Sequence, residues 1–359
     1  MSISGLSLPE PPRTMFASDN ASGIHPAYLE AITSANVDHQ LAYGSDPLSS
    51  AAEQMFQNLC GVNVEVLMCF GGTGANVLAL SMLLERGESV MCTDKAHIAV
   101  DETGAPEKFL GAKLHSVAAL DGKLQADDIH RLARELGNIH HVQPGVVSIS
   151  QPTELGTLYS LAEISEIVSA AHSYNMRVHL DGARIANAVV ALGNTSQTFR
   201  AMTFDLGVDA VSFGGTKNAM WNAEAVLLAP HIAATHGSLT GAIMRKQVTQ
   251  LPSKMRFTAA QFIRSFTDDL WLETAQNAND SAHVLWESLS DISALQLSQP
   301  AVNSLYPILS DPAKSILQQW CFFWDWDRSR DQVRWMTSWD TTQADIALFS
   351  TAVRQVLGL

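Results

Sequence analysis

The sequence has little cysteine and no long apolar run. The longest apolar stretches, such as 189–192 and 225–229, fall far short of a membrane span. The N-terminus has no basic segment followed by an apolar one, so we expect no signal peptide and a cytoplasmic location. No C-x-x-C pair occurs, and apolar neighbours predict reduced, buried thiols. The four cysteines are Cys60, Cys69, Cys92 and Cys321.

Positive charge is also scarce. Lys and Arg number 22 against 36 Asp and Glu, which gives a formal net charge of −14. A nucleic-acid surface needs a clustered basic face, so this class of partner is not expected, although a local pocket for one small phosphate remains open. With 47% hydrophobic and 16% charged residues in 359, the chain reads as a soluble globular protein with one large and one smaller domain.

From about residue 48 to 230, short apolar runs alternate with helical patterns, which indicates a mostly parallel sheet covered on both faces. A helix over 160–175 is expected to start with a capping box of Ser160 and Glu163. A further helix follows the first strand and ends at Gly87. We predict an N-terminal arm (1–13), a large domain (14–250) and a small C-terminal domain (251–359). The predicted strands are 64–70, 88–93, 145–150, 177–183, 209–215 and 223–229.

A glycine-rich turn, Gly71-Gly72-Thr73-Gly74, separates the first predicted strand from a helical pattern. Glycines there let backbone N–H groups approach a phosphate at the positive end of the helix. Asn76 breaks the G-x-G-x-x-G fingerprint of dinucleotide sites, and the Gly-Lys-Ser/Thr ending of a P-loop is missing. The turn alone fits either a phosphate site or a tight structural turn.

Charged residues end other predicted strands. Asp181 lies in an apolar strand, where burial is costly unless a positive group such as a pyridinium nitrogen is near, or unless the carboxylate caps the next helix. Arg184 follows it and suits a bidentate grip on a carboxylate. Lys217 follows Phe213-Gly214-Gly215-Thr216. Its amine can form a Schiff base with an aldehyde, or it is an exposed loop lysine.

These features come together in space if the sheet is parallel, because ligands bind where the carboxyl ends of the strands meet. A Gly/Thr phosphate turn, a strand Asp and a strand-end Lys together describe a site for pyridoxal 5′-phosphate (PLP), covalently bound to Lys217. The combination is far more specific than its parts.

The chain resembles the low-specificity L-threonine aldolases over nearly its whole length, and most of all the bacterial members that carry FGGTKN at the lysine. The resemblance implies the aspartate-aminotransferase-like PLP fold (fold type I), an α/β fold with a mostly parallel seven-stranded sheet and a smaller C-terminal α/β domain. It implies retro-aldol cleavage of L-threonine, L-allo-threonine and related L-β-hydroxy-α-amino acids to glycine and an aldehyde. The strings that carry it are FASDNASG, AYGSD, GGTGAN, AHIAVDETGAPE, HLDGARIANA, FGGTKNAM and SKMRF.

The resemblance also implies roles in cofactor binding. Lys217 is the Schiff-base lysine, Asp181 holds the pyridinium nitrogen, and His97 stacks on the cofactor ring. The residues implied at the phosphate and elsewhere around the cofactor are Gly72, Thr73, Gly74, Thr216, Arg184 and Arg256.

Substrate and subunit contacts follow in the same way. Arg184 and Arg334 are implied to grip the substrate carboxylate, with Ser18 assisting. The resemblance implies a homotetramer, a dimer of dimers with active sites at the dimer interface. The residues implied to complete a neighbouring subunit's site are Tyr43, Lys254 and Arg256.

One position departs from the family pattern. Many members carry a second active-site histidine in a Thr-His-Asn-Gly string, whereas residues 152–156 read Pro-Thr-Glu-Leu-Gly, with Glu154 in that place. The general base is therefore His97, Glu154 or a water held between them. Alternatives to the aldolase are another PLP reaction, such as β-elimination, racemisation or transamination, and a PLP-free nucleotide-binding module or inactive scaffold. The pair at 140–141, His-His, is expected at the surface and not on a metal.

Overall fold

The computed structural model describes residues 2–3 and 6–359, so residues 1, 4 and 5 of the expected arm lie outside the described residues. The chain divides into a larger unit, residues 24–270, and a smaller unit of residues 1–23 and 271–359. The expected arm thus belongs to the smaller unit, and the expected division after residue 250 lies inside the larger one.

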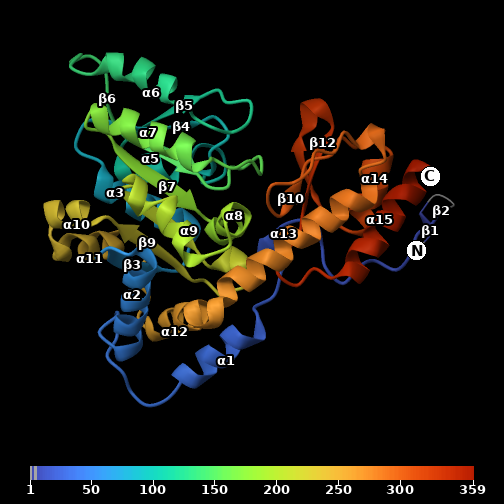
Figure 1. Cartoon of the computed structure of the whole chain (residues 1–359), viewed down its shortest axis with the longest axis horizontal. Helices are drawn as coiled ribbons and strands as arrows, with labels where there is room; N and C mark the ends of the chain where they lie inside the picture. Colours follow the sequence, from blue (N-terminus) through green and yellow to red (C-terminus); the bar gives the residue numbers. More distant parts are fainter. Residues whose placement is uncertain (1, 4–5) are drawn as a thin grey trace. The chain divides into compact units, whose positions relative to one another are not determined.

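A seven-stranded sheet forms the centre of the larger unit (Figure 1). Its order is β3-β9-β8-β7-β6-β4-β5, and only the pairs made by β9 are antiparallel. The prediction of a mostly parallel seven-stranded sheet is confirmed. The strands are β3 (Glu65–Cys69), β4 (Glu88–Thr93), β5 (Lys113–Val117), β6 (Gln143–Ser150), β7 (Arg177–Gly182), β8 (Ala210–Gly214) and β9 (Glu224–Leu228). We did not predict β5, an edge strand with no fully buried residue and hence no apolar run.

Helices cover both faces of this sheet, with α7, α8 and α9 in front of it in Figure 1. The helices of the unit are α1 (Pro26–Ala35), α2 (Pro47–Cys60), α3 (Gly72–Leu83), α4 (His97–Val100), α5 (Ala105–Leu110), α6 (Ala126–Leu132), α7 (Leu161–Ser173), α8 (Ile185–Leu192), α9 (Ser196–Ala201), α10 (Pro230–His236), α11 (Ser238–Gln247) and α12 (Arg256–Phe266). The expected capping box of α7 is present. The helix expected to end at Gly87 is α3, which ends at Leu83 and takes Gly72 and Gly74 into its first turn.

Two apolar layers hold the helices to the sheet. On one face, alternate strand residues such as Leu67, Val90 and Val226 join the buried side of α3 in one core. On the other face Phe213 of β8 lies edge-to-face with Phe56 of α2, at 5.3 Å between ring centroids, and also meets rings of α9 and α12. The central strands are buried on both sides, which explains their nearly continuous apolar sequence, whereas edge strand β5 is not.

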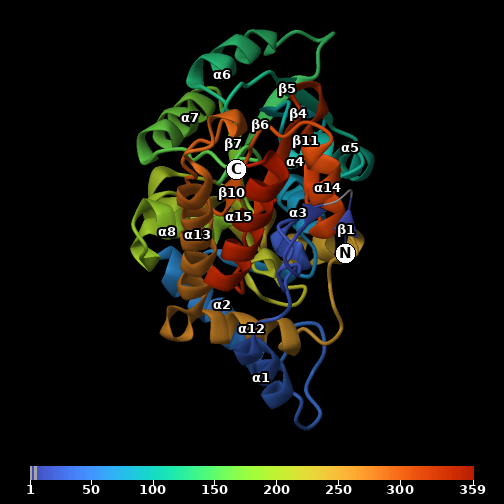
Figure 2. The ribbon, with the colours of Figure 1, turned by 90° about the vertical axis from the view of Figure 1, so that its right-hand side faces the viewer.

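The smaller unit is also α/β, as predicted. A three-stranded antiparallel sheet in the order β10-β12-β11 shares a core with α13, α14 and α15, which are seen from that side in Figure 2. At the centre of the core Phe349 contacts Phe16, Trp335 and Phe323. The elements are β1 (Ser2–Ile3), β2 (Leu6–Ser7), α13 (Leu270–Leu289), β10 (Ser304–Leu305), α14 (Ala313–Trp320), β11 (Trp324–Asp327), β12 (Gln332–Met336) and α15 (Gln343–Leu357).

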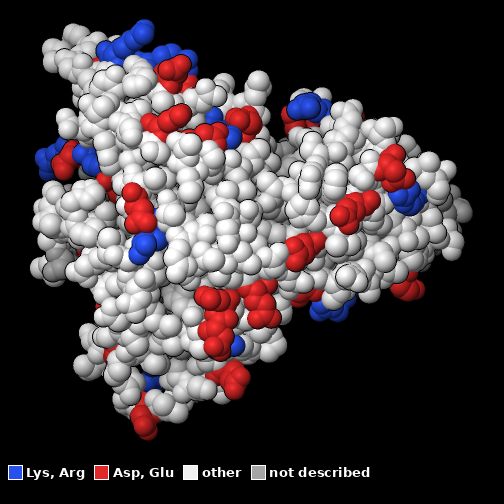
Figure 3. Space-filling view, in the orientation of Figure 1, with Lys and Arg blue, Asp and Glu red and all other residues white. Residues whose placement is uncertain are grey.

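The thiols and the surface agree with the sequence analysis. All four cysteines are free and buried, and burial raises the pKa of the Cys92 thiol to about 12. Within residues 2–3 and 6–359, no helix has the length and apolar character needed to cross a membrane. On the face seen in Figure 3, acidic side chains are spread widely and most basic ones lie beside acidic ones.

One ion-pair cluster at the other end of the sheet gives a pH-dependent prediction. Asp209, before β8, is buried and accepts hydrogen bonds from Nε2 of His172 at 2.9 Å and Nε2 of His231 at 2.7 Å. The hydrogen bond to Asp209 raises the pKa of His172 above 6.5. The stabilisation from His172 is therefore complete below its ordinary pKa and is lost as pH rises through the raised value.

We accordingly expect His172→Gln to lower the thermal midpoint at about pH 6 and to have much less effect at about pH 9. The control is His140→Gln, because His140 is exposed and lies outside this cluster. Thermal scans of both variants at the two pH values make the comparison. An equal loss from His172→Gln at both pH values would show that the charge on His172 does not contribute.

Candidate active site

The candidate site lies at the carboxyl-terminal end of the parallel strands of the large sheet. The turn Gly71–Gly74 follows β3, His97 follows β4, and Glu154 follows β6. Asp181 is in the last part of β7, and Lys217 follows β8. Parallel topology therefore gathers at one edge residues that are far apart in the sequence, as predicted.

Asp181 is buried, and both of its carboxylate oxygens accept hydrogen bonds. Oδ1 accepts from the backbone N–H of Ala183 at 3.0 Å, and Oδ2 accepts from Nδ2 of Asn76 in α3 at 2.8 Å. Asp181 thus caps the turn that leads into α8, which is the structural alternative considered from the sequence. Because each oxygen has a second lone pair, the same carboxylate can also meet a cation.

His97 begins α4, and its ring is 37% exposed. Its Nδ1 lies 2.8 Å from Oε1 of Glu102, whose side chain is wholly buried. This hydrogen bond is the main cause of a raised pKa for His97, and the negative charge of Asp181 acts in the same direction. The positive charge of Lys217 acts against it, so Asp181, His97 and Lys217 belong to one electrostatic site.

Glu154 contacts the same helix start. Its Oε1 accepts from the backbone N–H of His97 at 2.9 Å and from the hydroxyl of Ser150 at 2.7 Å. Burial raises the pKa of the Glu154 carboxyl, and these two donors partly offset that effect. A carboxyl in this state is a candidate acid or base at the site.

Lys217 lies in a short 3-10 turn, Thr216–Asn218, directly after β8. Buried Glu224, at the start of β9, lies beside Thr216, whose hydroxyl accepts a hydrogen bond from the backbone N–H of Ala223 at 3.2 Å. Burial raises the pKa of Glu224 to about 7. The hydrogen bond between Ala223 and Thr216 thus ties the lysine turn to the residue that precedes β9.

The glycine turn leaves open space at Gly72 and none at Gly74. A Cβ added at Gly72 would meet no atom within 4 Å, whereas one at Gly74 would lie 2.1 Å from Cδ of Gln250. Gln250 is largely buried, and its Oε1 is 3.4 Å from the backbone N of Phe70. The start of α3 is thus open at Gly72, while the Gln250 side chain covers it at Gly74.

We predict that Gly74→Ala destabilises the protein by about 1–3 kcal/mol, because the added methyl group must displace Gln250. The penalty should shrink in a Gln250→Ala background, where the obstacle is gone. Chemical unfolding of the wild type, both single variants and the double variant measures this. Equal penalties in the two backgrounds would show that Gln250 is not the obstacle.

Arg184 and the two other residues implied in substrate binding are placed in different units. Arg184 is the half-buried N-cap residue of α8, directly after the Asp181 turn. In the smaller unit Nη2 of Arg334 donates to the backbone O of Ala17 at 3.2 Å, and its guanidinium lies 4.9 Å from the ring centre of Trp326. Arg334 thus lies beside the segment that holds Ser18, which caps a short 3-10 turn.

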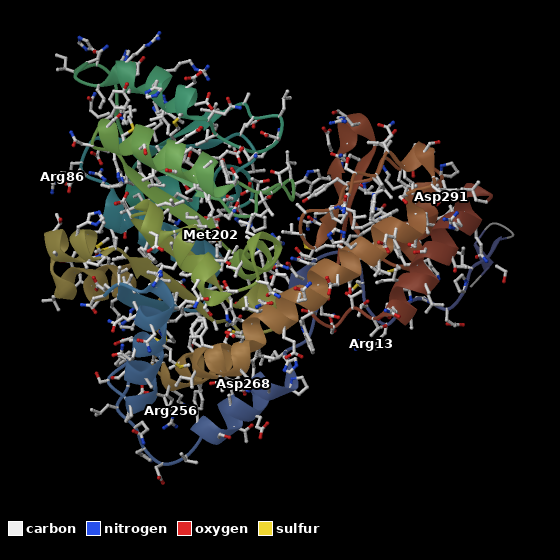
Figure 4. All side chains as sticks on the ribbon, viewed as in Figure 1. Arg13, Arg86, Met202, Arg256, Asp268 and Asp291 are labelled. Carbon is white, nitrogen blue, oxygen red and sulfur yellow. The ribbon has the colours of Figure 1, made fainter. Side chains whose placement is uncertain are left out.

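The residues expected to reach a neighbouring subunit lie together on the larger unit. Arg256, labelled in Figure 4, starts α12, and its Nη1 donates to the backbone O of Val37 at 3.3 Å and of Asp38 at 3.0 Å. Tyr43 donates its backbone N–H to Ser253 at 3.0 Å. Lys254 is exposed, and so are the histidines at 140–141.

Sequence reasoning missed several polar residues of the site. Asn76 was noted only because it breaks a dinucleotide fingerprint, although it is buried and contacts Asp181. Glu102 is part of the string AHIAVDETGAPE, which was a usable signal, whereas Ser150 and Glu224 had none. Asn76 meets Asp181 across 105 residues, so only the folded chain reveals that contact, whereas Ser150 and Glu102 contact Glu154 and His97, four and five residues away.

The fold is that of an α/β protein of the aspartate-aminotransferase-like class, and the candidate site with Lys217 lies at the carboxyl-terminal end of its parallel strands. An aspartate aminotransferase from Rhodobacter sphaeroides matches with a TM-score of 0.68 at 16% identity, over 99% of this chain and 95% of that chain, which is a likeness of fold alone. The family described as Beta-eliminating lyase matches residues 15–311, and the chain belongs to this family.

More similar proteins have a narrower description. A low-specificity L-threonine aldolase from a Pseudomonas species is 37% identical over 95% of this chain and 97% of its own length. The structure of a threonine aldolase from Leishmania major matches with a TM-score of 0.87 at 28% identity, covering 95% of this chain and 99% of that chain.

Proposed function

We propose that this protein is a PLP-dependent L-threonine aldolase that cleaves L-threonine, L-allo-threonine and related L-β-hydroxy-α-amino acids to glycine and an aldehyde. The observation that carries the proposal is the gathering of Lys217, Asp181 and His97 in one electrostatic site of a family member. The full-length similarity to low-specificity L-threonine aldolases supports the reaction class.

The residues present fit PLP. A buried carboxylate, Asp181, has lone pairs left for a ring nitrogen, the half-exposed His97 offers a ring face, and Lys217 offers an amine. The start of α3 is open at Gly72, so backbone N–H groups of 72–74 can receive the phosphate. When bound, PLP supplies an aldehyde that condenses with amines and a ring that accepts electrons from a breaking bond.

The protein's own residues then select the reaction. Lys217 would hold the cofactor, because its amine can form a Schiff base with the PLP aldehyde. Asp181 would hold the ring nitrogen in its protonated form, and Arg184, with Arg334 and Ser18 as the resemblance implies, would bind the substrate carboxylate. A carboxylate held in this way would select which bond at Cα can break once PLP supplies its electron-accepting ring. A few apolar contacts to the aldehyde part would discriminate poorly, in keeping with low specificity.

For the general base we propose Glu154. Burial moves the pKa of its carboxyl upward, toward the pH range in which a base works best. His97 is less suited, because Glu102 holds Nδ1 and favours the protonated imidazolium. Glu154 would take the proton of the substrate β-hydroxyl as the Cα–Cβ bond breaks.

The deciding experiment is an absorption spectrum of the purified protein with PLP, before and after L-allo-threonine, with glycine and acetaldehyde assayed. We expect a near-visible band and both products. A band without these products would retain PLP and indicate another amino-acid lyase or a racemase. The absence of a band even with added PLP would overturn the cofactor and every role based on it.

We further propose a cytoplasmic homotetramer, a dimer of dimers whose active sites lie at the dimer interface. The free, buried cysteines support a reducing compartment. The segment fastened by Arg256 exposes large apolar side chains, Val37 at 58%, Leu41 at 72% and Tyr43 at 49%, which favours contact with another subunit. Light scattering after size exclusion tests the tetramer, and a monomer would contradict it.

A further inference from the structure

A single buried amide links two carboxylates at the candidate site. Nδ2 of Asn76 donates to Oδ2 of Asp181 at 2.8 Å and to Oε1 of Glu102 at 2.8 Å. Oε1 of Glu102 in turn lies 2.8 Å from Nδ1 of His97. Asn76, Glu102 and Asp181 are 3%, 4% and 6% exposed. The four side chains therefore form one continuous hydrogen-bonded network, in which Asn76, Glu102 and Asp181 are shielded from water and the His97 ring is partly exposed.

This arrangement determines the orientation of the amide. Both neighbours of Asn76 are carboxylates, so its NH₂ group must face them, one N–H for each. Its Oδ1 is left buried with no hydrogen-bond partner within the described part of the chain, and so is Oε2 of Glu102. Leaving such atoms unsatisfied is costly. The unpartnered Oδ1 of Asn76 therefore results from turning both N–H groups of its amide toward Asp181 and Glu102.

The two ends of this hydrogen-bonded network, Asp181 and His97, are proposed to contact different parts of the cofactor. Asp181 is the partner of the ring nitrogen, and His97 is the residue that stacks on the ring. Asn76 lies in the second turn of α3, whose first turn is the phosphate turn. Helix α3 thus carries both the proposed phosphate turn and Asn76, which contacts Asp181 and, through Glu102, is linked to the His97 ring.

We propose that Asn76 is a positioning residue that sets Asp181 against the ring nitrogen of PLP and, through Glu102, orients His97 over the ring. The proposal rests on the proposed function. Asn76 is proposed to act mainly through the contact between Asp181 and the ring nitrogen. Removal of the Asn76 amide should therefore weaken binding most for a ligand that has this nitrogen.

The test compares PLP with its analogue that carries C–H in place of the ring nitrogen. Dissociation constants of both ligands are measured on the apoprotein by equilibrium dialysis, together with the absorption maximum of bound PLP. Asn76→Ala should weaken PLP about tenfold, because a charge-assisted hydrogen bond is lost, and should weaken the analogue only about twofold. It should also shift the absorption maximum. Asn76→Ser, which keeps one donor, should give an intermediate loss of PLP affinity.

Two further variants separate positioning from a general loss of structure. Glu102→Gln acts on the His97 arm and should weaken both ligands equally. Asn303→Ala is the matched control in the smaller unit, because Asn303 is also a buried asparagine that donates to a carboxylate, Asp19, and has an unpartnered Oδ1. It should leave both dissociation constants unchanged.

The outcomes distinguish this proposal from the function on which it rests. Equal losses of PLP and of the analogue in Asn76→Ala, or no loss, would overturn the positioning role while wild-type binding leaves the proposed function intact. Failure of the wild type to bind PLP would overturn the proposed function, and the role of Asn76 with it. If Asn76→Ala does not fold, Asn76→Ser decides by the same comparison of the two ligands.

Discussion

Lys217→Ala should abolish the near-visible absorption band of the PLP-loaded protein and lower kcat by on the order of 10⁴-fold or more, because both the covalent hold on the cofactor and an amine that moves protons are lost. The turn around Lys217 should survive, since the backbone N–H of Gly215 donates to the carbonyl O of Ala223 at 3.0 Å and the backbone N–H of Ala223 donates to the Thr216 hydroxyl at 3.2 Å. We therefore expect little change in thermal stability. Spectra, steady-state kinetics and a thermal scan make up the measurement.

A chemical trap locates the attachment directly. Borohydride reduction of the loaded wild type, followed by peptide mass spectrometry, should place the cofactor on Lys217. Lys113→Ala, at an exposed lysine on β5, is the matched control and should keep both the band and the activity. A band that persists in Lys217→Ala would show that another amine holds PLP and would contradict the assignment.

Glu154→Gln should lower kcat by about 10²–10⁴-fold, the usual contribution of a general base, and should leave the absorption band in place. The amide oxygen can still accept from His97 N–H and the Ser150 hydroxyl, and burial favours a neutral group here, so the fold should be at least as stable. Kinetics with L-allo-threonine and a spectrum of each variant test this. An unchanged kcat would show that Glu154 is not the general base and would leave His97 or a water molecule for that role.

The pH dependence provides a second readout for Glu154. A base must be ionised, so wild-type activity should rise with pH through the raised pKa of the Glu154 carboxyl, and this acid limb should be missing in Glu154→Gln. Ser150→Ala is the informative companion. The Ser150 hydroxyl lowers the pKa of Glu154, so its removal should move the acid limb to higher pH with little loss of the plateau rate. A limb that stays in place in Ser150→Ala would contradict this role.

Much of the fold could be predicted because buried parallel strands have a distinctive sequence. The apolar runs of β3, β4, β7, β8 and β9 each ended within one residue of the predicted limits. Edge strand β5 and the first turn of α3 were misjudged for a local reason. β5 lacks a buried face, and glycines lower helix propensity, although tertiary packing of α3 outweighs that penalty.

The sequence by itself predicted that Asp181 and Lys217 lie together, because each comes at the end of an apolar strand in a parallel pattern and ligands bind where the carboxyl ends of such strands meet. Only the tertiary structure decided what holds them. Asn76 bridges Glu102 and Asp181, which lie 26 and 105 residues away in the sequence. Such contacts are set by the distances between packed elements, and no local pattern of residues encodes those distances.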